Sequence, residues 1–307
     1  MRDDAIGFLL KSGARAAACA DIAAWWAAYR ATAKTWRNPM DCAIVAGFAA
    51  DRVGWAFASG YQAALHALFP GAPEDKICAL CVTEEEGNTP KAIKTSLDKN
   101  KLNGSKKWTT LGPGGALFFV AARDEAASGD RAAIRIARVA SGTKGVSIEE
   151  MPPTKFVPEV PHARLKFENV AIAEDDVLAG DGYELYVRPF RTVEDLHVHA
   201  AVLAYLVREA RRLKWPESWV ERAVALLFSL QNLSIKDPST PETHVALAGA
   251  LAIGAGLVRE SETHWRNTSD AAAERWQRDR DLLKVAGGIR EQRTKRAWER
   301  LNRGPAP

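Results

Sequence analysis

Hydroxyl side chains and one indole are grouped around two apolar segments within residues 77–123. The first apolar segment ends in Cys-Val-Thr at residues 81–83, and the second follows Trp-Thr-Thr at residues 108–110. Hydroxyl and backbone groups at strand ends can hydrogen-bond the edge of a flat heteroaromatic ring, and an indole can cover its face. This combination of residue types favours a site for a planar cofactor.

The elements that must position these residues change character twice along the chain. Residues 4–69 are rich in alanine, and apolar positions from Ile44 to Leu65 recur every three to four residues, as in core-facing helices. Asp41, two residues after Pro39, is the expected N-cap. Helical patterns return after residue 185. Further helices are expected at residues 189–213, 217–235, 241–265 and 270–302.

Residues 76–172 carry strand patterns instead. Short segments rich in β-branched and aromatic residues alternate with Gly, Pro, Asn and Asp, which favours an antiparallel barrel or sandwich. Helices, then strands, then helices is the segregated order of an α+β fold. We therefore expect an N-terminal helical domain at residues 1–74, a middle antiparallel β-barrel at residues 75–182, and a C-terminal helical bundle at residues 183–307.

Charge, cysteine content and hydropathy argue against several classes of function. The net charge of +4 is small for a chain with 42 basic and 38 acidic residues, so we expect no nucleic acid partner. Four cysteines in 307 residues do not indicate a disulfide framework. We expect no secretory leader, and no uninterrupted run of about 18 apolar residues predicts a membrane span. A cytoplasmic protein is the expectation.

Three other patterns could suit metal or phosphate chemistry, and each has a simpler interpretation. Cys78 and Cys81 lie in an apolar strand without a second such pair, so we expect packing. His197 and His199 are two residues apart, whereas helical ligand pairs prefer three or four. We therefore expect no metal site. The basic helix end at residues 290–303 is expected to face solvent or another subunit, with binding of CoA phosphates or of nucleic acid as the alternative.

Several motifs occur in an order that resembles the middle domain of acyl-CoA dehydrogenases. In chain order they are Cys81-Val82-Thr83-Glu84, Ile93-Lys94-Thr95, the segment from Leu102 to Thr110, Val120-Ala121-Ala122-Arg123 and Phe167-Glu168-Asn169-Val170. The resemblance covers residues 77–185, and Arg278-Asp279 extends it weakly. It implies the three-part α+β fold given above, with a flavin between the barrel and the bundle.

In that family the planar ring is the isoalloxazine of FAD, and the resemblance implies FAD here. By position, Val82 and Thr83 would hydrogen-bond its pyrimidine edge. Trp108 would lie against the ring, with Thr110 near its redox nitrogen. Donors at the pyrimidine edge stabilise the negative charge that the ring gains on reduction. The cofactor residues implied by the resemblance are Cys81, Val82, Thr83, Asn88, Thr89, Trp108 and Thr110.

The resemblance also implies a carboxylate base that removes a proton from the substrate α-carbon while hydride leaves the β-carbon. Much of the family holds this Glu at a fixed spacing after an Arg-Asp pair, and here that position is Gly287. Some relatives hold the base at the start of the first helix of the C-terminal bundle. Glu194 or Asp195 occupies that place and is the candidate base. Acids at a helix start otherwise interact with the helix dipole and are usually solvated.

Other family features are altered or missing. The turn after Thr83 carries Glu85 and Glu86, which would repel a diphosphate unless they point away. Asn88 or Thr89 takes the place of a Ser that meets the pyrophosphate or the acyl thioester in the family. The Arg-x-x-Phe-Gly and Gly-Gly-x-Gly segments that serve the distal parts of FAD are missing, and the N-terminal helical part is short.

The family motifs that are present and those that are missing together leave three candidate functions. The preferred one is an oxidoreductase of fatty acid metabolism, a flavoprotein that performs FAD-dependent α,β-dehydrogenation of an acyl-CoA thioester. An electron-transfer flavoprotein or another acceptor would reoxidise it, and the family pattern implies a homo-oligomer, dimer or tetramer. The alternatives are a degenerate, non-catalytic binding subunit and a flavin monooxygenase, because one fold supports many chemistries.

Overall fold

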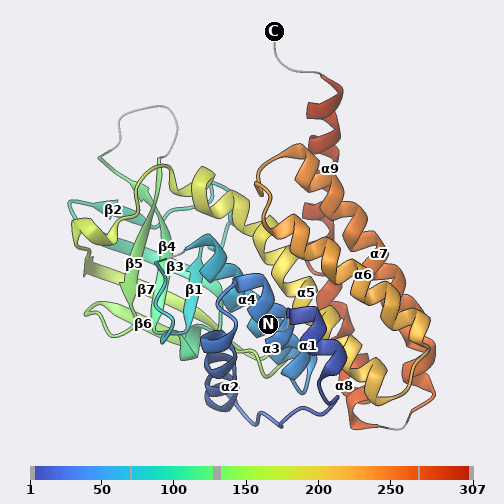
Figure 1. The fold of residues 1–307 in the computed structure, drawn as a ribbon. Coiled ribbons are helices and arrows are strands. Elements are labelled where there is room, and N and C mark those ends of the chain that lie inside the picture. The colour runs from blue at the N-terminus through green and yellow to red at the C-terminus, as the bar shows by residue number, and fades with distance from the viewer. Residues whose placement is uncertain (1–3, 70, 127–132, 269, 304–307) are drawn as a thin grey trace. The chain divides into compact units, whose positions relative to one another are not determined.

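The computed structural model describes residues 4–69, 71–126, 133–268 and 270–303 (Figure 1). The chain forms two compact units. The helical unit contains residues 1–67, 155–157 and 192–307, and the sheet unit contains residues 68–154 and 158–191. Helices from both ends of the sequence therefore share one unit, while the three-domain division stays a prediction.

The helical unit begins with α1 (Ala5–Lys11), α2 (Ile22–Thr35), α3 (Pro39–Ala49) and α4 (Val53–Leu68). Side chains cap the free amides at the starts of α1, α2 and α3, from Asp4, Asp21 and Asn38. The Oδ1 atom of Asn38 accepts hydrogen bonds from the amides of Met40 and Asp41 at 3.0 and 3.2 Å. The prediction of Asp41 as N-cap was therefore wrong, since Asp41 lies in the first turn of α3.

Helices α3 and α4 touch the backbone of α5 (Arg188–Arg212) at two glycines. A Cβ atom added at Gly47 would lie 2.2 Å from the carbonyl oxygen of Ala201, and one at Gly60 would lie 2.6 Å from the Cα of Val198. Backbones can approach this closely only where a side chain is absent. Gly47 and Gly60 therefore set how the N-terminal helices pack on the bundle.

The bundle continues with α6 (Glu217–Ser234), α7 (Pro241–Arg266), α8 (Ala271–Asp279) and α9 (Gly287–Asn302). The first three predicted helices of this region are confirmed to within one residue at each end. The fourth, predicted over residues 270–302, is divided. A 3-10 segment, Arg280–Lys284, and a left-handed Ala286 with a φ of 67° separate α8 from α9.

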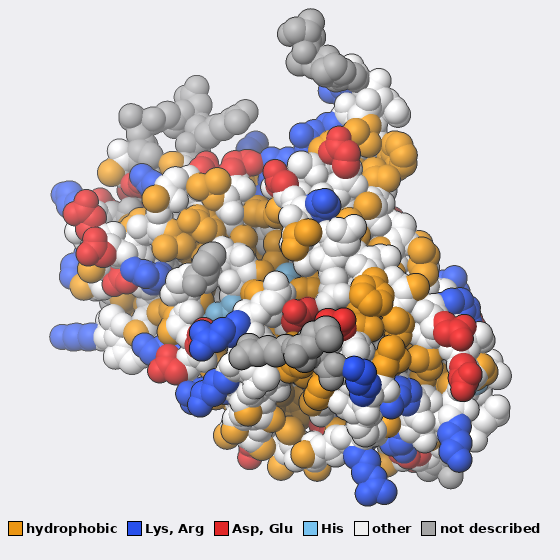
Figure 2. All heavy atoms as spheres, viewed as in Figure 1, with side chains coloured by type: hydrophobic (Ala, Val, Ile, Leu, Met, Phe, Trp, Pro, Cys, Tyr) orange, Lys and Arg blue, Asp and Glu red, His pale blue; other side chains and the backbone are white. Residues whose placement is uncertain are grey.

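Helix α7 is apolar although much of its surface is exposed. Its most apolar 18-residue window has a mean hydropathy of 1.3, and 22% of that window is buried. By length and composition alone α7 could cross a membrane, but a single such helix is weak evidence because core helices meet the same criterion. The sequence criterion missed it because Arg259 ends the uninterrupted apolar run. Figure 2 shows hydrophobic side chains along α6 and α7, where Phe228 and Ile253 are exposed.

The sheet unit contains β1 (Cys78–Cys81), β2 (Ser96–Asp98), β3 (Lys101–Thr110), β4 (Leu117–Asp124), β5 (Ile134–Ala140), β6 (Val146–Glu150) and β7 (His162–Ala171). The hydrogen-bonded order is β1-β4-β2-β3-β7-β6, and β5 pairs with β4. Short helical turns lie at Gly112–Gly114, Glu174–Asp176 and, with π-helical bonding, Tyr183–Val187. One face packs a core that includes Leu102, Phe118, Val120, Leu165, Phe167 and Val170.

The α+β class is confirmed, but the antiparallel barrel is not. Strand β4 runs parallel to both β1 and β2, so the sheet is mixed. Among the described strands, no pairing joins β6 to β1 or β5 to close the sheet. The remaining pairs, including β3 with β7 and β4 with β5, are antiparallel as expected. Side-chain alternation identifies a strand but carries no information on its direction, which explains the difference.

Candidate functional site

Trp108 is presented to solvent by an irregularity in β3. The register of β3 with β7 shifts between Lys106 and Thr109, which marks a β-bulge. Trp108 lies in this bulge with a φ of 59°, in the left-handed region that bulky residues rarely adopt. Its side chain is 48% exposed, and its ring meets His162 edge-on with 5.9 Å between centroids. The strained backbone therefore turns a large aromatic ring outward rather than into the core.

The loop that follows β1 lies against this bulge. The amide of Lys107 donates to the carbonyl of Thr83 at 2.8 Å. Glu84 and Gly87 donate their amides to each other's carbonyls at 2.8 and 3.2 Å, which closes a tight turn. Within the described part of the chain, the amides of Val82 and Thr83 have no backbone acceptor. Two backbone donors are therefore available on the loop that contacts the bulge.

A buried ion pair supports this loop from the core. The Nζ atom of Lys106 lies 2.6 Å from Oε1 of Glu84, and the two side chains are 0% and 8% exposed. Glu84 also accepts hydrogen bonds from the amides of Lys94 and Thr95 at 2.8 and 3.0 Å. Burial raises the pKa of Glu84, but Lys106 and the two amides outweigh it and hold that pKa below its usual range. Burial lowers the pKa of Lys106 against the opposing effect of Glu84.

Glu84 and Lys106 belong to the family motifs, but no role was predicted for either residue. The sequence could have indicated this pair, because Lys106 follows Leu102 by four positions and thus faces the same, core side of β3. A lysine at a core-facing strand position requires a buried acid as partner. Glu84, the first acid after the apolar strand β1, meets that requirement.

The acids of the turn after Glu84 pair with cations. Glu85 lies 2.9 Å from Nζ of Lys107 and 2.7 Å from Nη1 of Arg164, and Glu86 lies 3.7 Å from Nζ of Lys94. These exposed pairs contribute little stability. They do balance the charge of both carboxylates, which reduces the repulsion expected toward a bound diphosphate.

Cys81 and Thr110 flank the site in different ways. Cys81 is buried, the hydroxyl of Thr109 donates to its sulfur at 3.8 Å, and burial raises the pKa of its thiol to about 12. Cys81 therefore packs the core beneath the loop. Thr110 is half-buried at the end of β3 and pairs with His162 across the sheet. Of the two, only Thr110 offers a hydroxyl at the partly exposed end of the strand.

Asn88 and Thr89 belong to the next turn of the same loop. Asn88 is half-buried and Thr89 is exposed. The carbonyl of Thr89 accepts the amides of Ala92 and Ile93 at 2.9 and 3.2 Å, which fixes the backbone of this turn. The predicted contacts of Asn88 and Thr89 with a cofactor stay predictions.

The candidate bases lie in α5, in the helical unit. Asp195 is buried, and Arg290 contacts its Oδ1 at 2.8 and 2.9 Å while Arg293 contacts its Oδ2 at 2.8 Å. Burial raises the pKa of Asp195, but His199 and both arginines outweigh it and hold that pKa below its usual range. Glu194, the preceding residue, is half-buried. Asp195 therefore joins α5 to α9 and is a weak proton acceptor.

The basic helix end at residues 290–303 follows its expectation only in part: Lys295, Arg296, Arg300 and Arg303 are exposed, but the first two arginines are not. Arg290 and Arg293 are only 21% and 12% exposed, because both contact Asp195. Glu291 and Trp298 on the same helix are exposed. The sequence could have indicated that Arg290 and Arg293 share one partner, because residues three positions apart lie on the same face of a helix.

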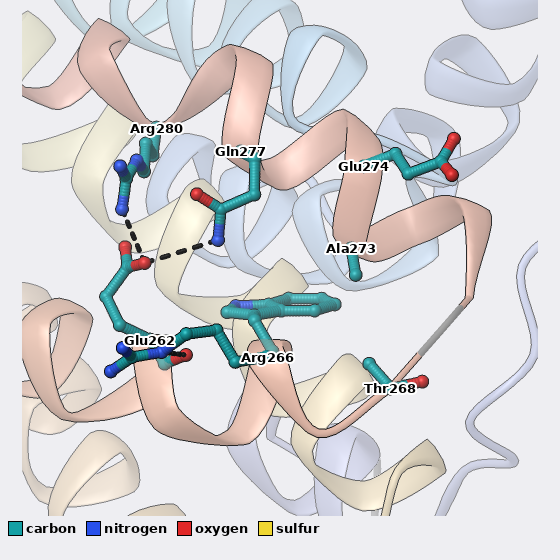
Figure 3. Close-up of a pocket in the computed structure, with 8 residues that line it drawn as sticks. Glu262, Arg266, Thr268, Ala273, Glu274, Gln277 and Arg280 are labelled. Atoms are coloured by element: carbon teal, nitrogen blue, oxygen red, sulfur yellow. Dashed lines mark hydrogen bonds and ion pairs between the residues drawn. The ribbon is translucent and has the colours of Figure 1, made fainter.

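A cavity of about 560 Å³ lies between α7 and α8 in the helical unit. Figure 3 shows Glu262 directed toward Gln277 and Arg280. The amide of Gln277 donates to Glu262 at 3.3 Å, and Arg280 forms an ion pair with it. The indole N–H of Trp265, which also lines the cavity, is buried without a hydrogen-bond partner among the described residues. Glu262, Gln277 and Arg280 pair with one another rather than converge on a ligand position, and Glu274 points away from them.

No protein-family model matches the sequence, and no curated protein matches it. Solved structures do. Butyryl-CoA dehydrogenase from Megasphaera elsdenii has a TM-score of 0.64 at 15% identity, over 84% of this chain and 81% of that one. Glutaryl-CoA dehydrogenase from Mycobacterium smegmatis has a TM-score of 0.63 at 13% identity, over 99% and 94%. PigA with FAD and proline has a TM-score of 0.67 at 13% identity, over 97% and 92%. The chain has the acyl-CoA dehydrogenase fold.

The resemblance seen in the motifs is therefore confirmed at the level of the acyl-CoA dehydrogenase fold. Identities of this size carry no residue-level assignment. The donor set in the sheet unit must be judged by its own chemistry, and it fits the flavin ring. The amides of Val82 and Thr83, which have no backbone acceptor among the described residues, suit the acceptors of a pyrimidine edge, and the exposed ring of Trp108 suits a flat heteroaromatic face.

Proposed function

We propose that this protein is a flavin-dependent oxidoreductase built on the acyl-CoA dehydrogenase fold. The observation that carries the proposal is the exposure of Trp108 from a strained β-bulge beside a loop with two free amides. A folded core gains nothing from holding a large indole in a strained, outward conformation. Strain of this kind is concentrated at functional sites, and binding of a flat ring ligand to the exposed indole would explain why it is present.

FAD, when bound, would supply the hydride acceptor. The amides of Val82 and Thr83 would hold the pyrimidine edge of its ring. Trp108 would cover one face and exclude water from it, and the hydroxyl of Thr110 would bond near the redox nitrogen. The free amides and the exposed indole support these roles, which come from the family resemblance.

The proposed reaction is α,β-dehydrogenation of an acyl-CoA thioester. A carboxylate of this chain would accept the α-proton, and the hydride from the β-carbon would be taken up by the acceptor that bound FAD supplies, which leaves a C=C bond. Glu194 is the better candidate for the carboxylate, because Arg290 and Arg293 reduce the basicity of Asp195. The shared fold of butyryl-CoA and glutaryl-CoA dehydrogenases supports this substrate class.

Reconstitution with FAD tests the cofactor. Purified protein mixed with FAD should stay yellow after gel filtration, and an anaerobic panel of acyl-CoA thioesters should bleach the flavin. Protein that retains no flavin would contradict the proposal. Bleaching by NADH but by no acyl-CoA would indicate the flavin monooxygenase instead.

Glu194→Gln and Asp195→Asn distinguish the candidate bases. If Glu194 is the base, Glu194→Gln should slow exchange of the substrate α-proton by roughly a hundredfold or more. Flavin binding should be unchanged, because Glu194 is not among the residues proposed to hold the flavin ring. Full exchange rates in both variants would show that the base lies elsewhere.

A non-catalytic binding subunit is the second candidate. Gly287 stands where much of the family holds its Glu and begins α9, and Asp195 is neutralised by two arginines. This candidate predicts that the protein binds FAD or an acyl-CoA without any bleaching. The same anaerobic titration decides between the two.

An electron-transfer flavoprotein or another acceptor is the proposed partner for reoxidation, in the cytoplasm.

A homo-oligomer is also proposed, and the exposed side chains of Phe228 and Ile253 along α6 and α7 support it. Sedimentation of Phe228→Ser and Ile253→Ser variants should show a smaller particle than the wild-type protein. An unchanged mass in both variants would place the subunit contact elsewhere.

A further inference from the structure

Lys106 has no access to solvent, yet its ammonium reaches a carbonyl of the candidate ring site. Its Nζ atom lies 2.6 Å from Oε1 of Glu84 and 3.3 Å from the carbonyl oxygen of Val82. The next lysine along β3, Lys107, instead forms a partly exposed pair with Glu85. Of these two side chains, only that of Lys106 connects the core of the sheet to the backbone of the loop, whereas Lys107 contacts the loop backbone through its own amide.

The contact at Val82 determines the direction of the following amide. The Val82 carbonyl and the Thr83 N–H belong to one planar peptide, which is trans because the described chain has no cis bond. In a trans peptide the C=O and N–H bonds point in opposite directions. A Val82 carbonyl held toward the buried ammonium therefore turns the Thr83 N–H away from it. The nearby cation also polarises the peptide, which makes that N–H a stronger donor.

Glu84 keeps the ammonium charged and in place. Its own carboxylate is fixed by the amides of Lys94 and Thr95, and the pKa of Glu84 lies below its usual range, so it is ionised at neutral pH. An ionised carboxylate at 2.6 Å stabilises the charged form of Lys106. The direction of the loop peptide is thus set by a chain of contacts that begins in the core of the sheet.

We infer that Lys106 is a positioning residue of the ring site, which aims and strengthens the Thr83 N–H as a donor to the pyrimidine edge of the flavin. The inference rests on the proposed flavin function. A stronger donor at that edge stabilises the reduced ring more than the oxidised one, because reduction adds negative charge there. A merely structural Lys106 would affect stability alone, without changing the Thr83 amide or the preference for reduced flavin.

The variants must remove the ammonium without leaving a buried charge. Lys106→Met alone would leave the Glu84 carboxylate buried without its cationic partner. The main variant is therefore Glu84→Gln with Lys106→Met, which removes both charges together. Glu84→Gln alone retains Lys106 beside the Val82 carbonyl. Lys101→Met is the matched control, since Lys101 is exposed at the start of the same strand.

The first measurement uses the protein without flavin. The backbone ¹H and ¹⁵N resonances of Thr83 should shift in the double variant, and its amide hydrogen should exchange faster, because the peptide loses its orientation. Lys101→Met should leave both unchanged. A Thr83 amide that is identical in the wild-type protein and the double variant would overturn the inference.

The second measurement is the midpoint potential of bound flavin. Relative to oxidised flavin, the double variant should bind reduced flavin about tenfold more weakly, which lowers a two-electron potential by about 30 mV. Equal potentials in the wild-type protein and the double variant would overturn the inference and leave the proposed function standing.

Two further outcomes are informative. Wild-type protein that binds no flavin would contradict the proposed function, and the Thr83 amide would then decide alone whether Lys106 orients the loop. If the double variant does not fold, Glu84→Gln replaces it, because loss of the carboxylate lowers the charged fraction of Lys106. Both measurements should then move in the same direction by a smaller amount, and no movement in either would refute the role of Lys106.

Discussion

Two buried charge clusters, one in each unit, contain similar charged groups but have different structural roles. In the sheet unit, one carboxylate and one ammonium pair, and both also bind backbone groups of the loop after β1. In the helical unit, one carboxylate is shared by two guanidinium groups, and it joins α5 to α9. The first cluster shapes a loop, whereas the second connects helices that are far apart in sequence.

The difference shows that a buried ion pair does not by itself indicate catalysis. Asp195 was a candidate base because of its place in the sequence, but its contacts lower its basicity. Glu84 and Lys106 had no predicted role, but their contacts reach the backbone donors of the candidate site. The partners of a charged residue are therefore more informative than its burial.

The largest expected effect is on the cluster that connects the helices. Asp195→Asn leaves Arg290 and Arg293 facing each other without their carboxylate, and breaking a buried pair in this way costs roughly 3–5 kcal/mol. The partial exposure of the arginines places the expected loss at the lower end of that range. Urea unfolding should measure it, with Glu291→Gln on the exposed side of α9 as the control. Equal stability of the two variants would remove the distinction between the clusters.

Mild acid should weaken the helical unit through His197. This side chain is buried in α5 with Nδ1 2.7 Å from the carbonyl oxygen of Val193, and burial lowers its pKa from 6.5 to about 4. Between these values the unfolded chain binds a proton that the folded chain does not, so stability falls as pH drops through this window. The full effect is about 3 kcal/mol. Below pH 4 this residue causes no further loss.

His197→Gln isolates that effect, because burial also lowers the pKa of His199 and, in the sheet unit, of His162. Urea unfolding at a series of pH values should show a shallower loss for the variant than for the wild-type protein. Parallel curves would mean that His197 becomes protonated in the folded protein without cost.

The smallest effect on stability is expected at the bulge of the sheet unit. Trp108→Gly removes an outward ring and the cost of a left-handed backbone, so stability should be unchanged or rise by about 1 kcal/mol. Flavin affinity should nevertheless fall strongly, because the face that covers the ring is lost. Trp298→Ala, at an exposed tryptophan of α9, is the control for loss of an indole. A variant that loses stability but keeps its affinity for flavin would show that Trp108 serves the fold.

The sequence predicted the helices of the bundle well, because their apolar period and their breaks at Pro and Asn are local signals. It predicted strands in the sheet unit but not their directions, because β1 and β4 are parallel only by virtue of long connections. The motif around Trp108 was found, yet its φ of 59° could not be read from residue types.

The role of Asp195 could not be predicted for a different reason. Its partners are about a hundred residues away on α9, and sequence alone does not show that α5 and α9 pack together. Without that contact, the rule that acids near a helix start are solvated was the simplest one to apply. The contact between Glu84 and Lys106, which are 22 residues apart, could likewise not be predicted without the path of the loop that brings them together.

The four free cysteines are divided evenly, with Cys19 and Cys42 in the helical unit and Cys78 and Cys81 in the sheet unit. All are buried, and burial raises the pKa of Cys42, Cys78 and Cys81 to about 12, so the folded protein should resist alkylation. Mass spectrometry of alkylated peptides would then follow the opening of each unit separately. The order in which these four thiols become reactive would show whether the two units unfold together or one at a time.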